Sequence, residues 1–292
     1  NFRFGDAASL TGRDTAAGMA GAMLMRGSRQ LSRVQIDQKL EALQTQGGVS
    51  GGLQGANLSL VSRRAQLPEA LALMATLLRE PAFAEDEFEQ LKLQAVTGLE
   101  ASRNEPGSIA AQALALHFDP WPAGHPLHVE TLDESLARLR ALRREDLVAF
   151  HRDFYGTAQG EVAIVGDFDP AAGRTQLEAL FADWKTPHPY QPIATRFTPV
   201  APVAERLLVA DKPNAVFMAR HNVPLRVTDD DYTALVVANR IFGGGALKSR
   251  LGDRIRQKEG LSYGVSSGIS AQTSDAHRQP SDADSHEAPC CR

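Results

Sequence analysis

The chain has 292 residues, of which 43% are hydrophobic, so it can bury a sizeable core, and its length predicts about two domains. Its formal net charge of −4 argues against a nucleic-acid-binding surface or a patch that binds anionic membranes. No stretch of about 18 uncharged apolar residues occurs, so we expect no transmembrane helix.

Strands and helices alternate along the first 185 residues, which predicts an α/β domain. Residues 2–4 resemble the end of a strand, Ser32 and Gln35 form a capping-box pattern at the start of a helix, and alternation over 56–60 predicts a strand. A buried strand is expected over 161–165, followed by a helix that opens at Pro170. The other expected helices lie at 15–25, 68–78, 85–102, 108–118 and, as one or two helices, 132–154.

Four prolines between residues 185 and 200 indicate a stiff linker, which we place at 186–199. A second α/β domain follows over 200–273, with strands expected at 206–209, 215–219 and 261–265 and helices at 230–242 and up to 258. It is less than half as long as the first domain and ends on strands without a covering layer, so we expect it to be incomplete. Residues 274–292 lack large apolar side chains before Cys290, which predicts a disordered tail from an out-of-frame end.

The most informative motif is a pair of residues seven positions apart, Arg256 and Tyr263. A glycine stop at Gly260 separates them, which predicts a helix-to-strand corner. Arg carries five hydrogen-bond donors and Tyr one, so together they suit a peptide carbonyl oxygen that gains negative charge. The alternative is a surface ion pair for Arg256 and a packed core position for Tyr263.

The order of several motifs resembles the pitrilysin/insulinase family of zinc peptidases over residues 1 to 273. The motifs are Phe4-Gly5, Met23-Leu-Met-Arg-Gly27, Arg79-Glu-Pro81, Phe154-Tyr-Gly156, Val165-Gly-Asp-Phe-Asp169, Ser249-Arg-Leu251 and the Arg256/Tyr263 pair. The resemblance implies a half-clamshell of two consecutive α/β domains that closes on a homologous half around a peptide. It also implies that Arg256 and Tyr263 contact the substrate and that a mobile Gly243-Gly244-Gly245 loop helps to admit it.

The zinc-binding motif of that family, His-x-x-Glu-His, is absent from its expected place before Met23-Leu24. Gly18, Gly21 and Ala22 stand at the ligand positions, and none of these side chains has a lone pair to offer. A catalytic zinc needs about three protein ligands, so we expect no metal in this chain and small residues that allow close packing. The chain therefore resembles the metal-free half, with zinc in its partner.

Other chemistry has weaker support in the sequence. His125 and His128 flank two residues of a proline-containing loop, where they could bind metal with Glu130 or cap a helix end. His151 is expected at the boundary of a helix core. Neither a Gly-x-Ser-x-Gly elbow nor a phosphate-binding Gly-Lys-Ser/Thr loop occurs.

Two hypotheses about function follow. In the first, the chain is the non-zinc-binding half of a zinc metalloendopeptidase, inactive alone, and its partner is a zinc-bearing half in the same polypeptide upstream or in a separate subunit. In the second, the same scaffold serves as a non-catalytic assembly or peptide-binding protein. Both Cys residues lie at the end of the chain, Cys290 and Cys291. A cysteine-free body fits the periplasm or the cytosol, and the family resemblance favours the periplasm.

Overall fold

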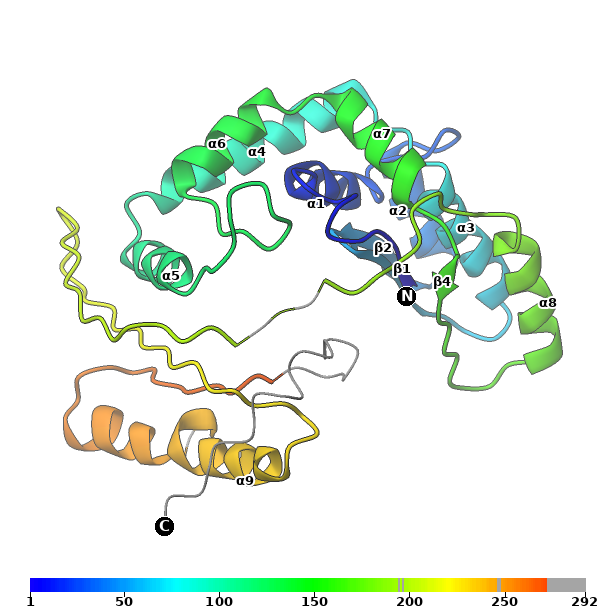
Figure 1. Ribbon diagram of the computed structural model, residues 1–292. Coiled ribbons are helices and arrows are strands. Elements are labelled where there is room, and N and C mark those ends of the chain that lie inside the picture. Colours follow the sequence, from blue (N-terminus) through cyan, green and yellow to red (C-terminus); the bar gives the residue numbers. More distant parts are fainter. Residues whose placement is uncertain (194, 196, 246–247, 272–292) are drawn as a thin grey trace, which may run out of the picture. The chain divides into compact units, whose positions relative to one another are not determined.

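A computed structural model describes residues 1–193, 195, 197–245 and 248–271 (Figure 1). Contacts between Cα atoms divide the chain into two compact units, the first comprising Asn1–Ile193 and Val200–Arg220. The second comprises Ala194–Pro199 and His221–Arg292, and each unit is considered by itself. The predicted domain boundaries at 185 and 200 stay predictions. The predicted disordered tail, 274–292, lies outside the described residues.

The first unit contains a small antiparallel sheet with the strand order β2-β3-β1-β4. Its strands are β1 (Phe2–Arg3), β2 (Gln46–Gly52), β3 (Gly55–Val61) and β4 (Gln159–Gly160). The predicted strand over 56–60 is confirmed as part of β3, which pairs with β2 along its whole length, from Gln46 opposite Val61 to Gly52 opposite Gly55. The mixture of helices with this sheet places the chain in the predicted α/β class.

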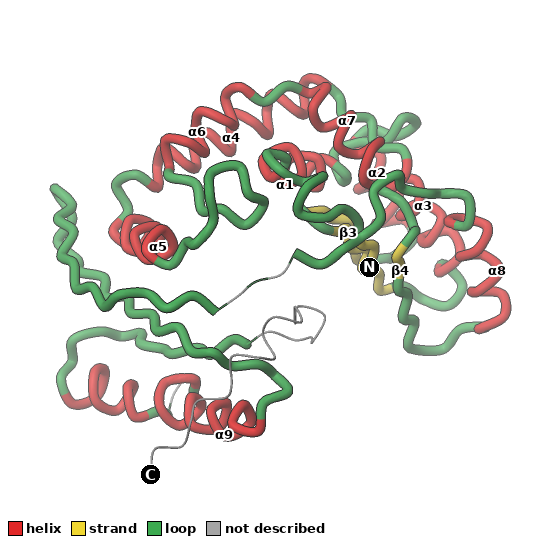
Figure 2. The backbone as a smooth tube through the Cα atoms, in the orientation of Figure 1, coloured by secondary structure: helices red, strands yellow, loops and turns green. Residues whose placement is uncertain are grey.

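Helices make up most of the rest of the first unit (Figure 2). In the described residues they are α1 (Asp14–Met23), α2 (Arg33–Ala42), α3 (Leu67–Arg79), α4 (Glu85–Ser102), α5 (Pro106–His117), α6 (Leu132–Ala141), α7 (Arg144–Phe154) and α8 (Pro170–Phe181). The predicted capping box is present, because the Ser32 side chain accepts a hydrogen bond from the N–H of Gln35 and the Gln35 side chain accepts one from Ser32. Pro170 opens α8 as predicted, with Asp169 as its cap. None of the described helices is long and apolar enough to span a bilayer.

The core lies between the sheet and helices α1, α3 and α7. Phe4, which follows β1, is fully buried, and its ring centroid lies 6.0 Å from that of Phe150 and 5.0 Å from that of Tyr155. Helix α8 packs outside α3, and α4 pairs with α6 (Figure 1). The apolar spacing of these helices in the sequence therefore corresponds to faces that are buried in the structure.

The outer edge of the sheet is covered by the segment that follows α1. The register directs the N–H of Val49 away from β3, and this N–H donates to the sulfur of Met25 at 3.3 Å. Met25 also lies against Gly48, so a methionine side chain occupies the edge where a further strand would pair.

The predicted buried strand over 161–165 was wrong. Strand β4 ends at Gly160, and the following residues form a loop in which Val165 is 97% exposed. Asn1 and Glu161 still exchange two backbone hydrogen bonds of 2.9 Å. Beyond Glu161 no strand of the described chain lies opposite, and a strand without a partner has no ladder to hold it.

Three further predicted strands, at 206–209, 215–219 and 261–265, are loops in the structure. Phe217 and Leu208 are exposed, and within the described residues no strand pairs with these segments. In the described part of the second unit, the regular elements are helix α9 (Asp230–Asn239), which continues into the wider turn η1 (Arg240–Gly244), and a second wide helix, η2 (Gly252–Lys258).

Candidate functional site

Arg256 and Tyr263 lie in one segment of the second unit, on either side of a glycine turn. Arg256 belongs to η2 and is half-buried. Gly260 takes a φ of +62°, in the left-handed region that favours glycine, and the N–H of Leu261 donates to the carbonyl of Ile255 at 3.0 Å. The predicted glycine stop is therefore present. Tyr263 follows it with its side chain 90% exposed, so it does not occupy a core position in this structure.

The start of η2 is held by Ser249, a residue of one of the resemblance motifs. Its buried hydroxyl accepts a hydrogen bond from the N–H of Gly252 at 3.1 Å, and its carbonyl accepts one from the N–H of Asp253 at 2.9 Å. At the other end of the helix, Arg254 and Glu259 form an ion pair of 2.8 Å. The helix that carries Arg256 is thus fixed by a serine cap and a glycine stop.

The glycine loop packs against the segment that follows Tyr263. The N–H of Ser267 donates to the carbonyl of Gly243 at 3.1 Å, and the Ser267 hydroxyl donates to the Asn239 side chain at 2.7 Å. Gly243 is buried, and a Cβ atom there would lie 2.5 Å from the Ser267 hydroxyl. The need for glycine at this position is therefore explained by close packing.

Gly244 and Gly245 complete the predicted loop. Gly244 accepts a hydrogen bond from the Arg240 side chain at 2.9 Å, and a Cβ on Gly245 would lie 2.4 Å from the carbonyl oxygen of Lys248. Gly243 and Gly244 belong to η1 and form its last residues, so they are part of a helical turn. A role of the three glycines in binding substrate stays a prediction.

Helix α1 carries the three positions where zinc ligands would stand. Gly18 and Ala22 lie on its exposed face, whereas Gly21 is buried against the backbone of β2. A Cβ atom on Gly21 would lie 2.2 Å from the carbonyl oxygen of Gly51, closer than any real contact. The predicted close packing of these small residues is confirmed at Gly21, and the donor set does not fit a zinc ion.

A residue that the sequence did not single out lies beneath the same strand. The Tyr155 ring is almost fully buried, and its hydroxyl has no hydrogen-bond partner among the described residues. Burial raises the pKa of this hydroxyl above its usual value. A Cβ on Gly51 would lie 1.9 Å from the hydroxyl oxygen, so Gly21, Gly51 and Tyr155 form three successive layers in which Gly51 has no room for a side chain.

The His125/His128 loop is stabilised by its own contacts. The His125 ring stacks on Trp121 at 4.0 Å, and the His128 ring nitrogen lies 2.7 Å from the carboxylate of Asp119. Burial of Asp119 opposes its charge, but backbone N–H groups and His128 outweigh burial and hold the pKa of this carboxyl below its usual value. Glu130 pairs with Arg138 at 2.7 Å. Across the described residues, no group of three or more His, Cys, Asp or Glu side chains could hold a metal ion.

His151 lies on α7, as predicted, and its ring nitrogen is 2.8 Å from the carbonyl oxygen of Leu78. Burial lowers the pKa of this imidazole below its usual value. The ring therefore joins α7 to the end of α3 in its neutral form and has a structural role.

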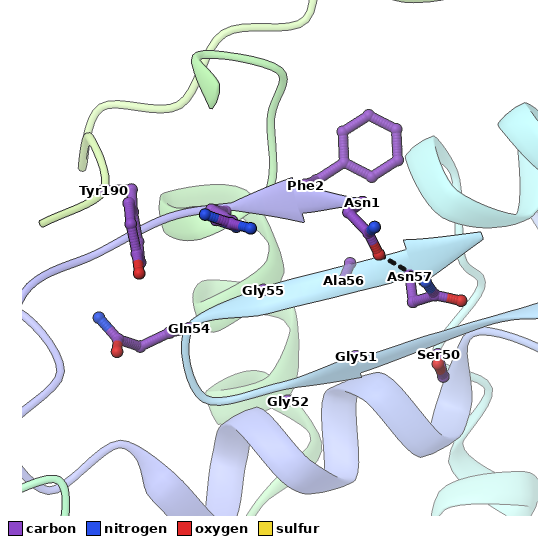
Figure 3. Close-up of a pocket in the computed structure, with 11 residues that line it drawn as sticks. Asn1, Phe2, Ser50, Gly51, Gly52, Gln54, Gly55, Ala56, Asn57 and Tyr190 are labelled. Carbon is purple, nitrogen blue, oxygen red and sulfur yellow. Dashed lines mark hydrogen bonds between the residues drawn. The ribbon is translucent and has the colours of Figure 1, made fainter. Parts of the chain in front are cut away.

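A hollow of about 520 Å³ lies over the sheet near the β2-β3 turn (Figure 3). Figure 3 shows Tyr190 and Gln54 at one end and Asn1 and Asn57 at the other, with glycines of the two strands between them. The Arg3 guanidinium lies 5.7 Å from the centre of the Tyr190 ring. Among the described residues that line the hollow, none is a carboxylate, an imidazole or a thiol, and its polar side chains are those of Asn1, Arg3, Ser50, Gln54, Asn57 and Tyr190.

Comparison with known proteins decides the family. Residues 141–278 match the family model described as the peptidase M16 inactive domain, and this range includes both Arg256 and Tyr263. Residues 141–278 thus resemble a peptidase M16 inactive domain. The resemblance to the metal-free half of the pitrilysin/insulinase zinc peptidases is thereby confirmed.

Other proteins similar to this chain agree with the match. It is 25% identical over 286 residues to an uncharacterized zinc protease from Streptomyces coelicolor, an alignment that covers 90% of this chain and 58% of that protease. A peptidase M16 inactive domain from Pseudomonas fluorescens superposes with a TM-score of 0.66 at 22% identity and covers 92% of this chain and 64% of that one. A protease from Helicobacter pylori gives a TM-score of 0.63 at 16% identity and covers 90% and 63%. The chain thus spans less than two thirds of each.

Proposed function

We propose that this chain is the metal-free half of a zinc endopeptidase, which pairs with a homologous zinc-bearing half and supplies Arg256 and Tyr263 to the bound peptide. The observation that carries the proposal is the match to the M16 inactive domain over a range that includes both residues. The exposure of Tyr263 supports it further, because a hydroxyl that reaches solvent is available to a ligand.

The chemistry of the two side chains suits a polarised peptide bond. The Arg256 guanidinium is permanently charged and offers a planar set of donors, while the Tyr263 hydroxyl offers a single donor. Both would strengthen their hydrogen bonds as negative charge develops on the carbonyl oxygen, which lowers the barrier more than it tightens ground-state binding. The zinc ion and the general base belong to the partner half, because Gly18, Gly21 and Ala22 give this chain no ligands.

The experiment is reconstitution with the zinc-bearing half and a quenched fluorescent peptide. Tyr263→Phe and Arg256→Ala are each expected to lower kcat by about 10²–10³-fold, the usual loss for one donor to a developing oxyanion. Arg256→Lys should recover only part of the activity, since a point charge does not reproduce the planar fork. Zinc content, measured by elemental analysis, should be the same in all variants because neither residue is a ligand.

Tyr263→Phe separates this function from the alternative because it removes only the hydroxyl. Unchanged kcat in a folded complex would contradict the catalytic role, and the chain would then be assigned to the assembly or peptide-binding class. Location in the periplasm stays part of the proposal, and secretion of the full-length protein is its test.

A further inference from the structure

Asn239 is the last residue of α9, directly before the helix widens into η1. Its side-chain amide makes two hydrogen bonds to a single residue, Ser267, which lies 28 positions further along the chain. The amide oxygen accepts from the Ser267 hydroxyl at 2.7 Å, and the amide nitrogen donates to the Ser267 carbonyl at 3.4 Å. The N–H of Ser267 donates in turn to the carbonyl of Gly243 at 3.1 Å. All three polar groups of Ser267 are therefore bound to the end of α9 or to η1.

The orientation of the Asn239 amide follows from these partners. A backbone carbonyl oxygen can only accept, so the amide nitrogen must face the Ser267 carbonyl and the amide oxygen must face the hydroxyl. The glycines of η1 leave room for this contact. A Cβ on Gly243 would lie 2.5 Å from the Ser267 hydroxyl, and a Cβ on Gly244 would lie 2.9 Å from the Asn239 amide nitrogen. The two glycines thus allow Ser267 to approach Asn239.

Tyr263 lies between two fixed points of its segment. On one side, the N–H of Leu261 donates to the carbonyl of Ile255 at 3.0 Å, and on the other side Ser267 is bound to Asn239. Figure 1 shows the segment, in orange to red, returning along α9. The Tyr263 side chain is 90% exposed, so packing around it contributes little to its position. Its place relative to η2, which carries Arg256, therefore depends on the two anchored ends of the segment.

The position of a hydrogen-bond donor decides how much it contributes to a reaction. A donor stabilises a developing negative charge only when it is held close to the place where the oxygen will be. A displacement of about 1 Å can cost on the order of a hundredfold in rate, even when the change that causes it lies away from the chemistry. A side chain that fixes one end of the Tyr263 segment can therefore affect catalysis without touching the substrate.

We propose that Asn239 is a positioning residue, which holds Tyr263 in place for the peptide carbonyl through its two hydrogen bonds to Ser267. This inference rests on the proposed function, in which the Tyr263 hydroxyl contacts the substrate. Asparagine suits the role because one planar group offers both an acceptor and a donor, whereas alanine offers neither.

The first test is the kinetics of the complex reconstituted with the zinc-bearing half, with a quenched fluorescent peptide as substrate. Asn239→Ala should lower kcat at least tenfold and change KM by less than about threefold, since the hydrogen bond from Tyr263 strengthens in the transition state. In a Tyr263→Phe background the same change should lower kcat by no more than about twofold, because the hydroxyl through which Asn239 acts is already missing. Equal losses in the two backgrounds would show a purely structural role and overturn the proposal.

A matched control is available in the same unit. The Asn222 side chain also donates to a backbone carbonyl, that of Thr198, at 3.3 Å. Asn222→Ala therefore removes a comparable hydrogen bond and should leave kcat within about twofold of the unaltered complex. A loss as large as that of Asn239→Ala would overturn the specific role of Asn239.

Amide hydrogen exchange of the chain alone is the second test and needs no partner. Asn239→Ala should speed exchange at Ser267 at least tenfold and leave exchange at Leu261 within about threefold, because the glycine stop is made within η2 and its following turn. Unchanged exchange at Ser267 would overturn the proposal. If exchange rises at both amides alike, Ser267→Ala decides the question. It removes a single hydroxyl and should lower kcat at least threefold, and an unchanged kcat in this variant would overturn the proposal.

The kinetic results also separate this inference from the function on which it rests. A loss of kcat with Tyr263→Phe but not with Asn239→Ala overturns the positioning role and leaves the proposed function standing. An unchanged kcat with Tyr263→Phe overturns both.

Discussion

At the scale of single residues, the structure shows how the positions expected for zinc ligands are packed. The sequence shows that Gly18, Gly21 and Ala22 offer no ligand atoms, but it does not show how close the sheet lies. Gly21 on α1 is in contact with the backbone of Gly51, so strand β2 occupies the space that a side chain at position 21 would need. Packing as well as ligand chemistry therefore disfavours a metal-binding side chain at position 21.

Gly21→Ala is expected to destabilise the first unit by about 1–3 kcal/mol, the usual cost of forcing extra atoms into a packed interface. Gly18→Ala is the matched control on the same helix, because a Cβ there meets nothing within 4 Å. The control should stabilise the unit by roughly 0.5–1 kcal/mol through helix propensity. Denaturant unfolding followed by circular dichroism measures both. Equal stability of the two variants would contradict the packing argument.

The environment of the Tyr155 hydroxyl could not be predicted from the sequence. Its motif, Phe154-Tyr-Gly156, contributes to the family resemblance, but a sequence does not reveal whether a buried hydroxyl has a partner. The Tyr155 hydroxyl lacks a partner among the described residues because α1, β2 and α7, three elements that are far apart in the sequence, enclose it. The exposure of Tyr263 could not be predicted from the sequence either, because it depends on whether another strand pairs with the segment that contains Tyr263.

At the scale of elements, helices were predicted far better than strands. The signals of a helix are local: Ser32 with Gln35, Asp169 with Pro170, and Gly260 each act within a few residues, and all three are found in the structure. A strand is stable only when a second segment pairs with it. The apolar run over 161–165 has the composition of a strand and no partner beyond Glu161, which explains the wrong prediction.

The packing of η1 against the segment after Tyr263 can be tested at Gly243. Gly243→Ala would place a Cβ atom 2.5 Å from the Ser267 hydroxyl and 2.8 Å from Leu251. We expect the variant to lose the hydrogen bond from Ser267 to residue 243 and to speed amide exchange at Ser267 by at least tenfold, which corresponds to about 1.4 kcal/mol.

Gly268→Ala is the control for this change, because a Cβ at residue 268 has nothing within 4 Å. It should leave exchange at Ser267 within about threefold of the unaltered chain. If Gly243→Ala and Gly268→Ala behave alike, Gly243 is not held by packing, and the mobile-loop interpretation of the three glycines is favoured instead.

At the scale of the whole molecule, the match to the peptidase M16 inactive domain and the residues at the expected ligand positions support the proposed pairing with a zinc-bearing half. The chain spans 58% of the Streptomyces protease that it matches. Sequence alone predicted the family, the α/β class and the residues at the empty ligand positions. It could not predict which strands pair with one another, because strand pairing joins segments that are far apart in the sequence.

The purified chain is expected to hold less than about 0.1 zinc per molecule after dialysis and to cleave no peptide alone, since catalytic zinc requires about three protein ligands. Elemental analysis and a quenched-peptide assay measure the two quantities. Recovery of one tightly bound zinc per chain would contradict the assignment to the metal-free half and direct attention to His125 and His128.

The Met25 sulfur on the edge of β2 has a consequence for colloidal behaviour. The unpaired backbone groups of an open edge strand can pair with a strand of a neighbouring molecule, and repeated pairing of this kind leads to aggregation. Here the N–H of Val49, which points away from β3, already donates to the sulfur of Met25. The Met25 side chain also covers the adjacent Gly48. The sheet is thus protected from indiscriminate growth at its β2 edge.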